Sequence, residues 1–434
     1  MTNPKVTEVF VPGTLPTHTY VDRGDSEFET ELRRGLRTPG KVVSISGPSK
    51  SGKTVLVRRV VGDANLVNVK LSGVNTTDQL WRKILDELGA PSETESFAEK
   101  TNQSSTRGLF GLDLKLPTVG GLRSEVEQTE THGETDGEAE RYTVNSIADV
   151  IEYLKEADLT LLLDDFHKAK NEDLQEEIAG TIKEITEDQI STCVALVPHR
   201  SDDLTRADPD LRGRVQVISM GFWSDEELRR IAELGFGALN VDFPDRVIKI
   251  FVNESAGSPQ LMQQLCLSAC YELNINEKKP SLTPIEINAD TIGKILRDVV
   301  KHSDHRTTIE LLDNGPKIRG EPRNQFEFND GKGDVYRAIL KAISGDPPKL
   351  SYGYEELKGR VDAICVDKSP SGSSITRACE KMNDLMIQDL EKEQPLEWDA
   401  TKGQGRLTIP DPYLLYHLRW SDQIDQRESF QSLL

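Results

Sequence analysis

One stretch of the chain, Lys41 to Val61 (KVVSISGPSKSGKTVLVRRVV), constrains the fold more than any other. A β-branched run leads into a turn rich in Gly, Ser and Lys, and a segment with helical apolar spacing follows. The turn, Gly47 to Thr54, fits the phosphate-binding pattern G-x-x-x-x-G-K-[ST] and stands between a strand and a helix, as that pattern requires. The sequence therefore predicts an α/β core with a P-loop that binds nucleotide.

The residue types in this turn indicate its chemistry. Gly47 and Gly52 permit backbone geometry that a Cβ would forbid, so that successive N–H groups can point at phosphate oxygens. Lys53 would place its charge between the β- and γ-phosphates of ATP, and the Thr54 hydroxyl would be a ligand of Mg²⁺. We expect the nucleotide to contact the whole turn and the residue after it, namely Gly47, Pro48, Ser49, Lys50, Ser51, Gly52, Lys53, Thr54 and Val55.

A second motif follows the P-loop at a distance of 110 residues. The apolar run Leu159 to Leu163 ends in Asp164 and Asp165, which is the pattern of a buried parallel strand that presents acids at its carboxyl end. Asp164 would hold Mg²⁺, directly or through water. Asp165 would orient or deprotonate the water that attacks ATP.

Composition sets further bounds. With 434 residues the chain is long enough for two or three domains. A net charge of −20 argues against a whole surface built for nucleic acid, although a local basic patch stays open. Five cysteines without metal-type spacing favour reduced thiols. Neither an 18-residue apolar run nor a secretion signal is present, so we expect a cytoplasmic protein without a membrane partner.

Three more stretches lie in a fixed order around these motifs. The first stretch precedes the P-loop and is Tyr20-Val21-Asp22-Arg23. The second precedes the strand predicted from Val215 to Met220 and is Asp210-Leu211-Arg212-Gly213-Arg214. The third opens a helix and is Gly257-Ser258-Pro259-Gln260. Together with the P-loop and the acidic strand end, this order resembles the STAND branch of the AAA+ P-loop ATPases. Within it, the chain looks similar to archaeal and bacterial ATPases of origin-recognition type.

The resemblance implies roles for five side chains. Arg23 would lie over the adenine, and His199 or Arg200 would sense the γ-phosphate at the end of the strand predicted from Thr192 to Val197. Arg214 or Arg212 would be an arginine finger, in cis or from a neighbouring subunit, unless these arginines hold a loop by a salt bridge.

The same resemblance implies a role for the helical lid. Pro259 would pack near the nucleotide, but Gln260 replaces the Arg that many relatives use as a second sensor.

The resemblance also sets the domain prediction. We expect an AAA+-type α/β P-loop core with a parallel sheet at 1–220, whose polar insert at 91–143 contains a strand or hairpin. A helical lid at 221–300, a linker at 301–332 and a winged-helix domain at 333–434 would follow. The third helix of that domain, Ser373 to Leu390, is net acidic, which favours a protein contact over DNA.

These observations leave three functions open. The first is an ATP-controlled switch that assembles into a homo-oligomer or signals to a separate effector, with a place in bacterial anti-phage defence. The second is a DNA-engaging regulator of replication-initiator or transposition type, with DNA contacts at Arg107, Lys115 and Arg123. The third is an ATP-binding structural subunit with little turnover, because Asp165 is shorter than the Glu of active AAA+ sites.

Overall fold

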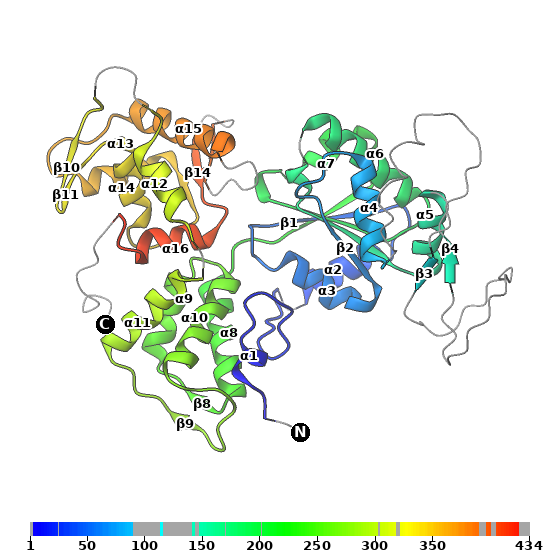
Figure 1. Ribbon diagram of the computed structural model, residues 1–434, viewed down its shortest axis with the longest axis horizontal. Helices are drawn as coiled ribbons and strands as arrows, with labels where there is room; N and C mark the ends of the chain where they lie inside the picture. The colour runs from blue at the N-terminus through cyan, green and yellow to red at the C-terminus, as the bar shows by residue number, and fades with distance from the viewer. Residues whose placement is uncertain are drawn as a thin grey trace. The chain divides into compact units, whose positions relative to one another are not determined.

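The computed structural model describes residues 3–24, 26–89, 113–115, 141–143, 147–169, 171–200, 202–302, 304–317, 322–389, 396–400 and 405–424. The chain divides into two compact units. The α/β unit comprises Ser26–Gly47 and Lys53–Met220. The helical unit comprises Met1–Asp25, Pro48–Gly52 and Gly221–Leu434. Figure 1 labels the elements of both.

A five-stranded parallel sheet organises the α/β unit, in the order β2-β5-β6-β1-β7. Its strands are β1 (Val42–Ser46), β2 (Leu66–Lys70), β5 (Thr160–Asp164), β6 (Thr192–Leu196) and β7 (Val215–Ser219). One strand, β6, therefore separates β1 from β5. Because the strands are parallel, the P-loop after β1 and the acids after β5 leave the same edge of the sheet.

Helices cover both faces of this sheet (Figure 1). One face packs on α2 (Glu27–Leu36) and α3 (Lys53–Val61) through a core that includes Leu162, Cys193 and Ala195. The other face packs through Leu161, Leu163 and Val194 on α4 (Thr77–Glu87), α5 (Ile147–Glu156), α6 (Glu172–Glu187) and α7 (Asp203–Ala207). Alternate residues of one strand thus enter different cores, and both faces are buried. This explains why the central strands β1, β5 and β6 read as largely apolar runs, whereas β2 and β7, at the two sides of the sheet, are only partly buried.

A short antiparallel pair stands apart from the sheet. Strand β3 (Asp113–Lys115) pairs with β4 (Arg141–Thr143). A strand is therefore present where the alternating leucines predict one. The rest of the insert, including Arg107 and Arg123, lies outside the described residues.

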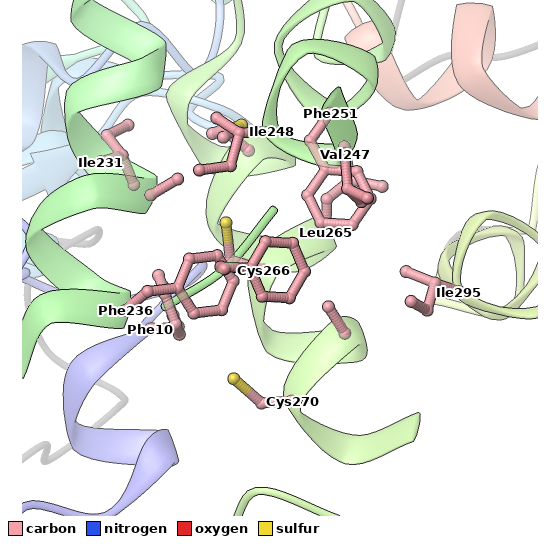
Figure 2. Close-up of a cluster of buried hydrophobic side chains, with 14 of the residues drawn as sticks. Phe10, Ile231, Phe236, Val247, Ile248, Phe251, Leu265, Cys266, Cys270 and Ile295 are labelled. Carbon is pink, nitrogen blue, oxygen red and sulfur yellow. The ribbon is translucent and has the colours of Figure 1, made fainter. Parts of the chain in front are cut away.

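The helical unit begins with α1 (Val6–Val9) and continues with α8 (Asp225–Ala238), α9 (Asp245–Glu254), α10 (Pro259–Glu272) and α11 (Ala289–Val300), with β8 (Val241–Asp242) paired to β9 (Thr283–Pro284). Figure 2 shows their shared apolar core. In it, Phe236 stacks on Phe243 with ring centroids 3.9 Å apart, and Phe10 meets Phe236 edge to face. Cys266 and Cys270 are buried here, and burial raises the pKa of Cys270 to about 12. Both cysteines therefore serve packing.

Two antiparallel sheets and five helices complete this unit. They are α12 (Arg306–Asn314), β10 (Phe326–Phe328), β11 (Gly331–Gly333), α13 (Val335–Ser344), β12 (Ser351–Gly353), α14 (Tyr354–Ile364), α15 (Gly372–Asp389), β13 (Glu397–Asp399), β14 (Arg406–Thr408) and α16 (Pro412–Trp420). The order helix, strand, helix, helix, strand, strand from α13 to β14 fits the predicted winged helix, and the assignment stays a prediction.

The stretch 301–332 is not only a linker. It contains α12 and strand β10, and β11 begins at its end. The helix was missed because its buried side chains, Ile309 and Leu312, are few and stand among polar residues, so its apolar period is short.

Helix α16 belongs to two cores of the helical unit. Tyr413, Tyr416 and Trp420 pack into the core of Figure 2. Leu414, Leu415 and Leu418 pack with α13 to α15. One helix thus ties the two cores together. Within the described ranges, no helix has the length and apolarity that a membrane span requires.

Candidate nucleotide-binding site

At Gly52 the P-loop has the backbone conformation that a glycine predicts. Gly52 has a φ of +95°, which side chains rarely adopt, and Lys50 is also left-handed at +59°. The Gly47 N–H donates to the Leu196 carbonyl at 3.1 Å, so the start of the loop is held against the end of β6. The P-loop is therefore fixed at the carboxyl edge of the sheet.

Lys53 lies buried at the start of α3, with 8% of its surface exposed. Its Nζ donates to the Gly47 carbonyl at 2.9 Å. Burial lowers the pKa of Lys53, and the charges of Asp164 and Asp165 oppose that shift. A cation in such a position favours an anionic ligand, since burying it without a counter-charge is costly.

Thr54 and Asp164 meet although 110 residues separate them. The Thr54 hydroxyl donates to Asp164 Oδ2 at 2.7 Å. A hydroxyl and a carboxylate are the hard oxygen donors that Mg²⁺ prefers alongside substrate phosphates. The donor set therefore fits the predicted metal, which Thr54 and Asp164 would hold.

Asp165 adopts the left-handed region, with a φ of +62°. Its carboxylate is 30% exposed and lies 3.1 Å from Lys168 Nζ. Asp165 thus stands one residue beyond the predicted metal ligand, with a partly exposed carboxylate. Sequence reasoning missed Lys168, and only its position three residues after Asp165 could have indicated the pair.

Lys50 and Ser51 belong to the P-loop segment that is part of the helical unit, and both have partners within that unit. Lys50 Nζ lies 2.6 Å from Asp411 Oδ1 and 4.6 Å from the centre of the Tyr413 ring. Burial would raise the pKa of Asp411, but a hydrogen bond from His305, together with Lys50, lowers it to about 2. The Ser51 carbonyl accepts from Trp223 Nε1 at 2.8 Å. The Asp411 and Trp223 contacts were not expected from sequence, because neither residue belongs to a motif.

Arg23 and Pro259 both lie in the helical unit. Arg23 Nε donates to Glu227 at 2.9 Å, its Nη2 donates to the carbonyls of Gly221 and Phe222, and its guanidinium lies 4.9 Å from the Trp223 ring centre. Pro259 is buried at the first position of α10, behind the Ser258 cap. A role of either residue at adenine stays a prediction.

The two candidate arginine fingers lie at the amino ends of the parallel strands, whereas the P-loop follows the carboxyl end of β1. Val42, the first residue of β1, is in register with Val215, the first of β7, so that Arg212 and Arg214 precede the amino end of the strands. Arg214 pairs with Glu187 at 2.7 Å, and Arg212 is exposed. The length of β1 excludes a role of either arginine at the P-loop of its own chain.

The sensor candidates follow β6 in a short 3₁₀ turn, Pro198–Arg200. This turn follows the carboxyl end of β6, at the same side of the sheet as the P-loop after β1. That position is the one that the predicted γ-phosphate sensor requires. Arg200 lies 3.5 Å from Asp203, and the side chain of His199 is outside the described residues. The choice between His199 and Arg200 stays open.

No family model and no curated protein matches the chain. Among solved structures it is similar to Cdc6p from Pyrobaculum aerophilum, at 14% identity and TM-score 0.42, over 96% of this chain and 99% of the other. It is also similar to the Walker-type ATPase paby2304 of Pyrococcus abyssi, at 13% identity and TM-score 0.49, over 94% of this chain and 100% of the other. A third similar structure is the ORC2 protein of Aeropyrum pernix, at 14% identity and TM-score 0.47, over 95% of this chain and 96% of the other. With a P-loop strand and an acidic strand separated by one strand of a parallel sheet, the α/β unit has the P-loop NTPase fold that AAA+ ATPases share.

Proposed function

We propose that this chain is an ATP-binding and ATP-hydrolysing AAA+ switch. The observation that carries the proposal is the convergence of Lys53, Thr54 and Asp164 at one sheet edge. These are a buried cation and two hard oxygen donors, the groups that phosphate and Mg²⁺ need. A loop with a purely structural role would not require the buried ammonium, the hydroxyl and the carboxylate at the same place.

Each group has a separate task in this proposal. Lys53 and the P-loop N–H groups would bind the phosphates, and Thr54 with Asp164 would hold Mg²⁺, which neutralises developing charge when bound. Asp165 would orient the attacking water and accept its proton, because its carboxylate is partly exposed beside Lys168.

Replacing Asp165 by Ala tests the enzymatic part of the proposal. We expect turnover to fall by about 100-fold, the typical contribution of a general base, while ATP affinity stays near that of the parent. Phosphate release and binding of a fluorescent ATP analogue measure the two quantities. Asp188→Ala, a remote exposed substitution, is the control. Turnover at the parent rate in Asp165→Ala would disprove the assignment, and an inactive parent would favour a structural subunit.

The place of Arg214 supports a further part of the proposal. Arg214 precedes the amino end of β7, away from the P-loop of its own chain, so as an arginine finger it would act on the γ-phosphate of a neighbouring subunit. We propose that ATP drives homo-oligomerisation and that Arg214 completes the neighbour's site. In the finer form of the proposal, the oligomer is a STAND-type switch that signals to a separate effector in anti-phage defence.

Turnover per subunit should then rise with protein concentration, and Arg214→Ala should lower it by about 10³-fold or more. Glu187→Gln, which frees Arg214 from its ion pair, should not lower it. Mass photometry with ADP or a non-hydrolysable ATP analogue, with and without duplex DNA, follows assembly. Assembly with the analogue alone supports the switch. Assembly only on DNA would favour the replication-initiator or transposition function instead.

A further inference from the structure

Helix α2, labelled in Figure 1, belongs to the α/β unit, and its sequence places the exposed residues Arg33, Arg34 and Arg37 at its carboxyl end. Together with two threonines they line an open hollow of about 400 Å³, formed by Thr30, Arg33, Arg34, Arg37 and Thr38. We propose that this surface, the α2 arginine row, binds consecutive backbone phosphates of a nucleic acid. The proposal concerns a site distinct from the P-loop and does not depend on ATP hydrolysis.

The row follows from the helical period. Residues 30, 33, 34 and 37 recur at i, i+3, i+4 and i+7, so they share one face of α2. The opposite face carries Phe28, Leu32 and Leu36, which pack into the core beneath the sheet. The three guanidinium groups therefore stand side by side along about 6 Å of helix, at about 1.5 Å of rise per residue.

The arginines are held on a rigid support. Gly35 packs so closely on the sheet that a Cβ there would come within 2.6 Å of Val43 Cγ2. Gln216 of β7 adds a hydrogen bond to the Glu31 carbonyl at 3.1 Å. The helix axis is thereby fixed, which lowers the ordering cost of binding an extended ligand.

No carboxylate in the described residues forms an ion pair with this row, although Glu27, Glu29 and Glu31 stand in the preceding turns of α2. The guanidinium groups of Arg33, Arg34 and Arg37 have neither an ion pair nor a hydrogen bond there. Other arginines of the same unit are paired, such as Arg58 with Asp63 and Arg214 with Glu187. In a chain with 73 acidic and 53 basic residues, three unpaired arginines concentrate positive charge at the carboxyl end of α2, whose glutamates lie toward its amino end.

The chemistry of the row favours a phosphate backbone. Each guanidinium offers a planar fork that matches a phosphate bidentately. The Thr30 hydroxyl can add a donor, whereas that of Thr38 already donates to the Arg34 carbonyl at 2.8 Å. A membrane is disfavoured, because the apolar face that an interfacial helix inserts is already buried in the core. Backbone contacts carry no sequence information, so we expect sequence-independent binding.

Cations near the carboxyl end of a helix also stabilise the helix dipole. If the arginines served only the helix dipole, replacing them would lower the free energy of unfolding and leave the affinity for nucleic acid unchanged. Binding and thermal unfolding must therefore be measured on the same variants, without nucleotide.

The test compares three triple variants of the full chain by fluorescence anisotropy with labelled duplex and single-stranded DNA over a range of salt. The first is Arg33→Gln, Arg34→Gln, Arg37→Gln. The second replaces the same arginines by Lys. The third, Arg230→Gln, Lys249→Gln, Lys301→Gln, removes as much charge from exposed positions of the helical unit.

We expect the first variant to lower the slope of log affinity against log salt by roughly one per arginine, or about 3 in all. The Lys variant should keep most of the slope, and the third variant should match the parent. Three results would each overturn the proposal: a parent that binds no DNA, a first variant that binds like the parent, or equal losses in the first and third variants. Binding of the parent to anionic vesicles but not to DNA would assign the row to a membrane instead.

Discussion

Replacing Lys53 by Ala is expected to lower ATP affinity by about 100-fold, because a hydrogen bond to a charged group contributes about 1.5–3 kcal/mol. Lys53 is buried next to Asp164 and Asp165, which oppose the lowering of its pKa. Without the ammonium group, these carboxylates would repel the phosphates that the loop is built to receive. Isothermal titration calorimetry with ATP and Mg²⁺ measures the change.

The neighbouring lysine provides the matched control. Lys50 belongs to the same loop, but its Nζ contacts Asp411, so Lys50→Ala should weaken ATP binding much less. Equal losses in the two variants would show that charge in the loop matters rather than the buried position of Lys53. Unchanged affinity in Lys53→Ala would refute the nucleotide site itself, and thermal unfolding of each variant checks that the fold persists.

Breaking the ion pair between Glu254 and Arg419 should cause the largest loss of stability. Both side chains have no exposed surface, and their contact is 2.8 Å. Trp420 Nε1 also donates to Glu254, at 2.7 Å. Burial would lower the pKa of Arg419, but Glu254 outweighs burial and raises it. Since α9 carries Glu254 and α16 carries Arg419, this pair joins the two cores of the helical unit.

Glu254→Gln would leave Arg419 buried without its main counter-charge, which costs about 3–5 kcal/mol. We expect the melting temperature of this unit to fall by roughly 6–20 °C. Asp346→Asn is the matched control. Asp346 also contacts Arg419, at 2.6 Å, but is 59% exposed, so its loss should cost about 1 kcal/mol or less.

A double variant separates charge from packing. Glu254→Leu with Arg419→Met removes both charges and should be less destabilised than Glu254→Gln, since well-packed apolar residues can replace a buried ion pair. A Glu254→Gln variant as stable as Asp346→Asn would show that the pair does not hold the two cores together.

The sequence predicted much of the α/β unit because its signals are local. The strands are rich in apolar and β-branched residues, with unbroken apolar runs in β5 and β6. Each strand is bounded by a turn or an acid, so the existence of the strands and their order along the chain could be inferred. The same reasoning missed α12, where two buried side chains leave too short a period. It also could not place Arg214, because the register of β1 with β7 is not visible along the chain.

The sequence by itself determined the P-loop, its lysine, and the two acids after a buried strand. These depend on backbone geometry and burial within a few residues, which composition and spacing specify. Only the tertiary structure decided which distant residues meet: Thr54 with Asp164, the Ser51 carbonyl with Trp223, and Glu254 with Arg419. Among the residues that the structure describes, it also gave the arginines of α2 no ion-pair partner. The reason is physical, because contacts between residues 100 or more apart depend on how strands and helices pack, and local propensity carries no information about that packing.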